Sequence, residues 1–234
     1  MKVACQKKGN NSVGVAPQYC GSVGKVANSQ VGVFAGYSSS KGYGLISTQL
    51  FMPEKWFQEE YAQKRKDCAV PEDLTFKSKP QIALELIHKI EQSGLFQAKW
   101  IGVDCLYGNS KEFLEAIQDK YWYFADIKKE SLVWRDQPVF EVPVYKGRGP
   151  RPKKMAAATP AEHVLKIAED DTLPWQRMYL GEGSKGAVYS DIKCTRIFRA
   201  FEDQASEVSA KSCWLFIRRF DNGEIRFSVS NAPE

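Results

Sequence analysis

Apolar and polar positions alternate in two parts of the chain, and each predicts a β-hairpin. Residues 30–37 and 43–51 are strand-like runs joined by a short polar turn. Residues 214–220 and 224–230 form the clearest hairpin pattern, because Asp221-Asn222-Gly223 supplies the residues that tight turns require. The Gly-, Ser-, Asn- and Gln-rich stretch 7–30 predicts loop or irregular strand.

Helical spacing of apolar residues predicts three helices outside these hairpins. The strongest covers 80–93, where Ser78 can cap the start and Gly94 suits the end. A helical stretch is expected over 54–66, after a proline, and a short helix over 160–169.

A strand–helix–strand pattern follows the strongest helix. Residues 99–104 form a short apolar run that ends in a carboxylate, a helix begins at Asn109 or Ser110 and continues to Lys120, and residues 121–127 form the next strand. This pattern predicts a βαβ unit with parallel strands. After it, short strand-like pieces alternate with turns. We therefore expect an α/β part over 1–128 and a β-rich part over 129–234.

The composition describes an ordinary globular protein. The chain has 234 residues, of which 43% are hydrophobic, and contains no apolar run of membrane-spanning length. The first residues lack the apolar stretch of a secretory signal. The 6 cysteines are too scattered for a Cys-x-x-Cys motif, which favours reduced thiols in the cytoplasm over a disulfide scaffold or a zinc finger.

Positive charge is concentrated in two segments. The formal net charge is +5, and residues 1–50 contain five lysines without any Asp or Glu. A second basic segment over 146–154 contains no acidic residue. Such segments fit a polyanion partner, since each Lys or Arg that neutralises a phosphate releases a counterion. The alternative is an exposed surface that only keeps the protein in solution.

Asp104 is the main candidate for chemistry. Open α/β sheets place their sites at the carboxyl ends of parallel strands, and a carboxylate there can bind Mg²⁺. The alternative is a helix N-cap or a turn aspartate. A nucleophile–base pair of Cys105 and His88 is disfavoured, and Gly21-x-x-Gly24-Lys25 lacks the spacing of a P-loop. Trp134 and Trp175 could stack on bases, although packing is the simpler interpretation.

Five segments carry a resemblance to a known family. They are 7–33, Leu74-x-x-Lys77-x-Lys79-Pro80, Val103-Asp104-x-x-Tyr107-Gly108, 147–154 and Ser230-Asn231-Ala232-Pro233. Together they resemble the DDE transposases of bacterial insertion sequences, in particular the group named after insertion sequence seven-hundred-and-one. The resemblance covers essentially the whole chain, and 7–33 is its most specific part.

The resemblance implies a ribonuclease-H-like α/β core, incomplete here, with a β-rich insertion domain. It also implies that the intact family cleaves and joins DNA with two Mg²⁺ ions held by three carboxylates. Asp104 would be the catalytic residue and metal ligand. The implied DNA-binding residues are Lys7, Lys8, Lys25, Arg148, Arg151, Lys153 and Lys154. The implied partners are transposon-end DNA and either a second copy of the chain or an intact transposase. The resemblance also implies that the protein is cytoplasmic, is associated with the bacterial nucleoid when bound to DNA, and has no membrane partner.

The chain departs from the family at the other two carboxylates. The family's first Asp lies just ahead of the 7–33 segment, where residues 1–6 hold no acid, and its Glu lies beyond Ser230-Asn231-Ala232-Pro233. We therefore expect a transposase truncated at both ends, without the final catalytic helix, with at best one weak Mg²⁺ site and no cleavage activity alone. Pro17 also replaces an Arg common in relatives.

Two substitute carboxylates and two other functions remain open at this point. Glu207 and Glu224 could replace a missing ligand, but both fall in the expected insertion, where surface charges are the simpler role. The alternative functions are a non-catalytic DNA-binding remnant that regulates transposition, and an α/β protein with no nucleic-acid role.

Overall fold

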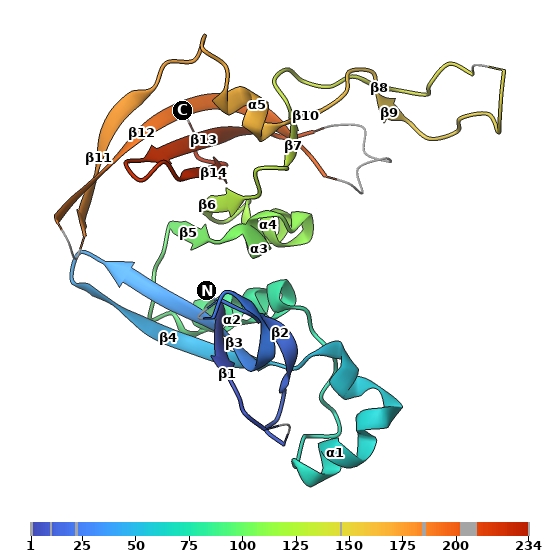
Figure 1. Cartoon of the computed structure of the whole chain (residues 1–234), viewed down its shortest axis with the longest axis vertical. Helices are drawn as coiled ribbons and strands as arrows, with labels where there is room; N and C mark the ends of the chain where they lie inside the picture. Colours follow the sequence, from blue (N-terminus) through green and yellow to red (C-terminus); the bar gives the residue numbers. More distant parts are fainter. Residues whose placement is uncertain are drawn as a thin grey trace. The chain divides into compact units, whose positions relative to one another are not determined.

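The chain forms two compact units in a computed structural model that describes residues 2–9, 11–21, 23–145, 147–183, 186–201 and 210–233. Unit 1 covers Met1–Ala98 and unit 2 covers Lys99–Glu234 (Figure 1). This division does not coincide with the expected boundary at residue 128, because the strands before that position hydrogen-bond into the sheet of unit 2. In the described residues no helix has the length and apolarity to cross a membrane.

Unit 1 contains a four-stranded antiparallel sheet built around one long strand. Strand β3 (Lys25–Ser39) pairs with β1 (Lys2–Gln6) along one edge, and with β2 (Ala16–Cys20) and β4 (Gly42–Phe51). The predicted hairpin over 30–51 is confirmed and is longer than expected. The stretch 7–30, expected as loop or irregular strand, contains β2 and the first part of β3.

The helix predicted over 54–66 is wrong as a continuous element. Two 3-10 turns, η1 (Glu54–Phe57) and η2 (Glu59–Tyr61), precede a short helix α1 (Ala62–Asp67), and Gln58 between the turns is extended with ψ 156°. Trp56 is fully buried, and its indole nitrogen donates to the Val15 carbonyl at 2.9 Å. The chain therefore bends where this side chain anchors it to the loop before β2.

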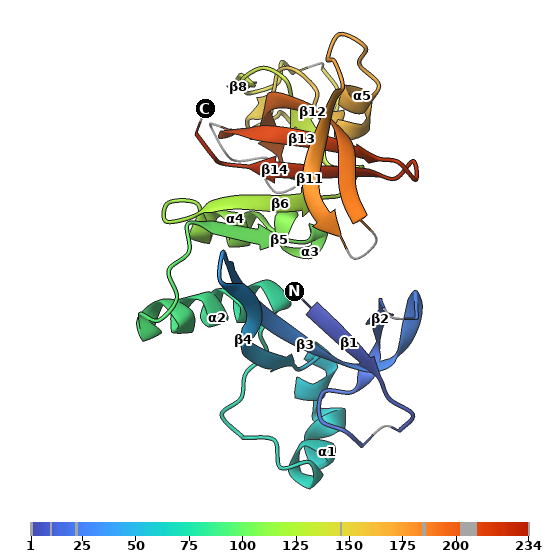
Figure 2. The same ribbon diagram turned by 90° about the vertical axis from the view of Figure 1, so that its left-hand side faces the viewer.

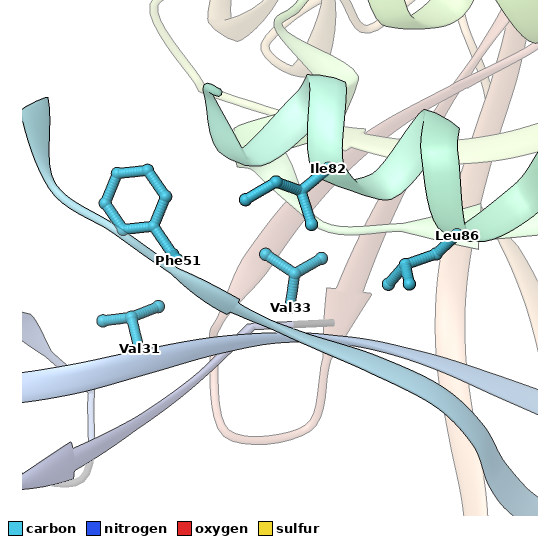
Figure 3. Close-up of a cluster of buried hydrophobic side chains, with 5 residues drawn as sticks. All are labelled: Val31, Val33, Phe51, Ile82 and Leu86. Carbon is cyan, nitrogen blue, oxygen red and sulfur yellow. The ribbon is translucent and has the colours of Figure 1, made fainter. Parts of the chain in front are cut away.

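The predicted helix over 80–93 is confirmed as α2 (Lys79–Ser93). Ser78 and Gln81 form a capping box, and Gly94 ends the helix in the left-handed region at φ 65°, which favours glycine. The helix packs its apolar face on the sheet. Figure 3 shows the buried cluster that joins them: Val31, Val33, Phe51, Ile82 and Leu86.

Unit 2 contains an eight-stranded mixed sheet. Its path runs β10 (Glu162–His163), β7 (Leu132–Trp134), β12 (Gly186–Ala200), β13 (Ser212–Phe220), β14 (Ile225–Ser230), β6 (Trp122–Ile127) and β5 (Trp100–Val103), while β11 (Gln176–Gly183) pairs with β12. A separate two-stranded ladder joins β8 (Phe140–Glu141) to β9 (Ala156–Ala157). The mixed α/β class expected from the sequence is confirmed.

The βαβ unit is confirmed in unit 2. Strands β5 and β6 are parallel, and the helices α3 (Cys105–Gly108) and α4 (Lys111–Ile117) lie between them in sequence and beside them in space (Figure 2). Helix α4 ends at Ile117, before the expected Lys120. Helix α5 (Val164–Ala168) occupies the middle of the stretch predicted over 160–169.

The hairpin predicted over 214–230 is also confirmed. Strands β13 and β14 pair with Arg219 opposite Ile225, and Gly223 adopts φ 82° in the turn. Alternate residues of β13, such as Leu215 and Ile217, are fully buried. Arg218 and Arg219 consequently lie on opposite faces of the strand, as their adjacent positions require.

Candidate functional site

Asp104 follows β5 directly and caps α3. Its Oδ1 accepts the backbone N–H of Leu106 at 2.8 Å, and the side chain is exposed. The position at the carboxyl end of a parallel strand agrees with the sequence expectation, and the N-cap alternative is realised as well. One carboxylate oxygen is therefore engaged by the chain, while the exposed group still faces solvent.

Gly108 explains part of the Asp104-x-x-Tyr107-Gly108 motif in structural terms. A Cβ at this position would run into the Asp126 carbonyl oxygen of β6, so only glycine allows α3 to approach the strand this closely. Tyr107 is 1% exposed and lies against Phe113, with ring centroids 5.3 Å apart. Burial, with a smaller effect of Asp104, raises the pKa of Tyr107 to about 12. The tyrosine is thus a neutral core residue.

Asp126 is a second carboxylate at the same end of the parallel pair, and the sequence analysis did not weigh it. Val103 is in register with Ala125, so Asp104 and Asp126 are the next residues of their strands. However, Oδ1 of Asp126 accepts hydrogen bonds from Arg218 at 2.7 Å and from the Ser228 hydroxyl at 2.5 Å. This carboxylate is engaged in an ion pair with Arg218 within the sheet.

The two carboxylates, Asp104 and Asp126, affect the pKa of the Cys105 thiol. Burial raises the pKa of Cys105, and the negative charges of Asp126 and Asp104 raise it further. A thiolate is therefore disfavoured here. His88 lies in unit 1 and contacts Gln92 at 2.9 Å, so nothing in the described residues supports the disfavoured Cys105–His88 pair.

A two-metal site does not fit the donor set that the structure describes. Among the described residues, no three His, Cys, Asp or Glu side chains gather closely enough to hold a metal ion. Glu224, considered as a substitute ligand, is exposed and pairs with Arg226 at 2.7 Å. Glu207, the other substitute, lies outside the described residues. Asp104 remains the one candidate ligand with an expected role.

Three of the predicted DNA-binding residues lie in unit 1. Lys8 and Lys25 are exposed and Lys7 is half-buried. The backbone N–H of Lys7 donates to the Asn28 carbonyl at 2.8 Å, and the Asn28 amide donates to the Gly9 carbonyl at 2.9 Å. These bonds attach the Lys7–Gly9 segment to β3, the strand that Lys25 begins.

The other four, Arg148, Arg151, Lys153 and Lys154, lie in unit 2, in the segment between β8 and β9. All four are exposed, and Figure 1 shows this segment extending away from the eight-stranded sheet. The Arg151 guanidinium lies 5.5 Å from the Tyr145 ring centre. We call residues 147–154 the basic arm. Its four cations belong to unit 2, whereas the three lysines belong to unit 1.

The two tryptophans considered for base stacking are packing residues. Trp134 is 8% exposed, and its indole nitrogen donates to the Thr159 carbonyl at 2.8 Å. The Trp175 ring lies beneath two cations, 4.7 Å from Lys193 and 4.2 Å from the Arg219 guanidinium. The simpler interpretation from the sequence is the one that the structure supports.

Asn231 of the Ser230-Asn231-Ala232-Pro233 segment is structural. Its amide nitrogen donates to the carbonyls of Gln118 and Tyr121 at 3.1 and 3.0 Å, and its Oδ1 accepts the Tyr123 N–H at 2.7 Å. The side chain thus joins the end of α4 and the start of β6 to the segment after β14. Its presence in the family-like pattern follows from this role in the fold.

Arg199 is a buried cation that the sequence analysis missed. It is 6% exposed and lies on β12, where the neighbouring inward position is the apolar Ile197. An arginine at an inward position of an alternating strand is a signal that could have been found in the sequence. The same is true of Asp126, which ends a predicted parallel strand as Asp104 does.

A known protein family matches most of the chain. The family model described as DDE superfamily endonuclease matches residues 2–187, which is more than half of the chain and contains Asp104, the three lysines and the basic arm. A search of the curated proteins finds no match for the sequence. The extent of the family match shows that the chain belongs to the DDE superfamily endonuclease family.

Proposed function

We propose that the chain is a DNA transposase polypeptide of the insertion sequence seven-hundred-and-one group that binds DNA and, by itself, does not cut it. The observation that carries the proposal is the position of Asp104 at the carboxyl end of β5, within the region matched by the family. This is where open α/β sheets hold catalytic groups. The ribonuclease-H-like core and the β-rich insertion are part of this proposal.

DNA is the partner that the charge distribution favours. The basic arm carries four exposed cations, and the exposed Lys8 and Lys25 add positive charge in unit 1. Contacts from such side chains to phosphates bind DNA without reading its sequence. We propose transposon-end DNA as the ligand in the bacterial cytoplasm, with a second copy of the chain or an intact transposase as the protein partner.

The lack of cleavage follows from the donor set. Phosphodiester cleavage by two Mg²⁺ ions requires several carboxylates that share the ions. In the residues described, Asp104 is exposed and available, whereas Asp126 is held by Arg218 and Ser228. One weak Mg²⁺ site at Asp104 is the most that this set supports. A non-catalytic regulator of transposition is the alternative that has the same properties.

A cleavage assay tests the proposal. Labelled duplex carrying an element end is incubated with the full chain and Mg²⁺ or Mn²⁺, beside the Asp104→Asn variant. We expect intact DNA in both reactions, and a retarded complex in the absence of metal. Cleavage by the natural chain that disappears with Asp104→Asn would contradict the proposed inactivity and would establish a nuclease. The absence of any complex would contradict DNA binding.

A further inference from the structure

A cavity of about 600 Å³ lies in unit 2 beside the end of β12. Its lining includes Asn109, Ser110, Lys128, Ser131 and Arg199. The volume falls within the range of small-molecule sites, about 300–1,000 Å³, and exceeds what a single small anion needs. All of these residues belong to unit 2.

The buried guanidinium of Arg199 gives this cavity its chemical character. Its Nη1 donates to the Gly108 carbonyl at 3.1 Å, whereas its buried Nε has no hydrogen-bond partner among the residues that the structure describes. The titratable groups that act on it are Cys213 and Tyr123, and burial lowers the pKa of Arg199. A buried cation without an anionic partner is costly, and so is a buried N–H without an acceptor. An anion in the cavity would offset the charge of the guanidinium.

Two lysines, Lys111 and Lys128, and the hydroxyl groups of Ser110 and Ser131 line the same cavity. Lys128 follows β6 and is exposed, and the Ser131 hydroxyl donates to Asn109 Oδ1 at 2.9 Å. Glu112 and Glu130 also reach the lining, but both are exposed and Glu130 lies 3.9 Å from Lys129. The guanidinium of Arg199, the lysine ammonium groups and the Ser110 hydroxyl, which accepts the Phe113 N–H, are donors suited to the oxygens of a phosphate group.

We propose that this cavity binds a phosphate group of a DNA strand, with room for the attached sugar, through Arg199 and Lys128. The inference rests on the proposed function for its source of phosphate, but the site itself is defined by residues away from Asp104 and outside the basic arm. It would give the strand a fixed point in unit 2, where the basic arm provides only exposed charges.

The test compares neighbouring lysines in the full chain. Lys128→Gln removes a cavity lysine, and the matched control Lys129→Gln removes the adjacent exposed lysine, which is absent from the lining. Affinity for a short duplex is measured against salt concentration. The slope of log K against log salt should become shallower by about 0.9 for Lys128→Gln, the value of one phosphate contact, and change less for Lys129→Gln. Equal slopes for the two variants would overturn the proposal.

Inorganic phosphate separates this site from the proposed function. Phosphate at constant ionic strength should raise the melting temperature of the natural chain and of Lys129→Gln, and raise it less in Lys128→Gln and Arg199→Met. A rise that depends on Lys128 in a chain that does not bind DNA would support the phosphate site while refuting the DNA source. A phosphate effect equal in all variants, or none in any, would overturn the site.

Discussion

The two units differ in what they bury. Among the described residues, unit 1 buries one polar side chain, Ser29, and its sheet is joined to α2 by an apolar cluster. Unit 2 buries two cations, Lys193 and Arg199, together with three serines. The described interior of unit 1 thus contains no buried charged side chain, whereas the interior of unit 2 also depends on how each charge is satisfied.

The two buried cations of unit 2 are satisfied to different degrees. Lys193 donates to the carbonyl of Ala168, the last residue of α5, at 2.9 Å and to that of Asp170 at 2.6 Å. Within the described part of the chain, Arg199 donates to one carbonyl and its Nε has no acceptor. The hydrogen bonds of Lys193 therefore stabilise the fold, whereas the guanidinium of Arg199 is the buried cation suited to bind an anionic ligand.

The largest expected effect comes from Gly108→Ala in unit 2. The added Cβ would collide with the backbone of Asp126, which cannot yield as a flexible side chain would. We expect a loss of about 3 kcal/mol or more in the free energy of unfolding, the upper end of overpacking costs. The control is Gly102→Ala on β5, where a Cβ meets no atom within 4 Å. Equal denaturation midpoints for the two variants would contradict the close approach of Gly108 to the backbone of Asp126.

Leu86→Ala tests the apolar character of unit 1. Leu86 is 2% exposed in the cluster of Figure 3, and truncation there should cost about 2–5 kcal/mol. Hydrogen exchange should show that peptides of Met1–Ala98 lose protection before those of Lys99–Glu234. The exposed neighbour Lys89→Ala serves as the control. Equal loss of protection in both units would contradict their division.

Lys193→Met and Arg199→Met compare the two buried cations directly. The first removes the donor of two carbonyls and should cost about 1–3 kcal/mol. The second removes a cation that lacks an anionic partner and should change stability by less than about 1 kcal/mol. Chemical denaturation of both variants measures the difference. A larger loss for Arg199→Met would mean that its charge is already compensated in the free protein.

The smallest effect concerns the pH dependence of Cys105. Burial and the charges of Asp126 and Asp104 raise its pKa, so its thiolate forms at higher pH than that of an ordinary cysteine, about 8.5. The pH midpoint of iodoacetamide labelling of Cys105, followed by peptide mass spectrometry, should therefore lie above that ordinary value. Asp126→Asn removes a negative charge and should lower that midpoint. An unchanged midpoint would show that Asp126 does not act on the thiol.

The sequence predicted elements that depend on local signals. The Ser78 cap and the Gly94 end defined α2, and Asp221-Asn222-Gly223 defined the β13–β14 turn. The helical spacing over 54–66 predicted one continuous helix. That prediction was wrong because the burial of Trp56 against Val15 bends this stretch. Local patterns contain no information about such a distant partner.

The candidate site was predictable to a similar extent. Asp104 was found because the end of a parallel strand is visible in the sequence. The inward position of Arg199 was visible in the strand pattern, but its contact with the Gly108 carbonyl and the cavity beside it depend on segments far apart in the chain. The ion pair of Asp126 with Arg218 joins distant strands in the same way.

Binding of DNA through phosphates is the central claim, and its salt dependence is the most direct test. The natural chain is compared with a variant in which Arg148, Arg151, Lys153 and Lys154 are replaced by Gln, using one short duplex and a salt series. We expect log K to fall linearly with log salt for the natural chain, and a clearly shallower slope for the variant. Absence of binding at low salt, or an affinity that does not change with salt, would contradict the account.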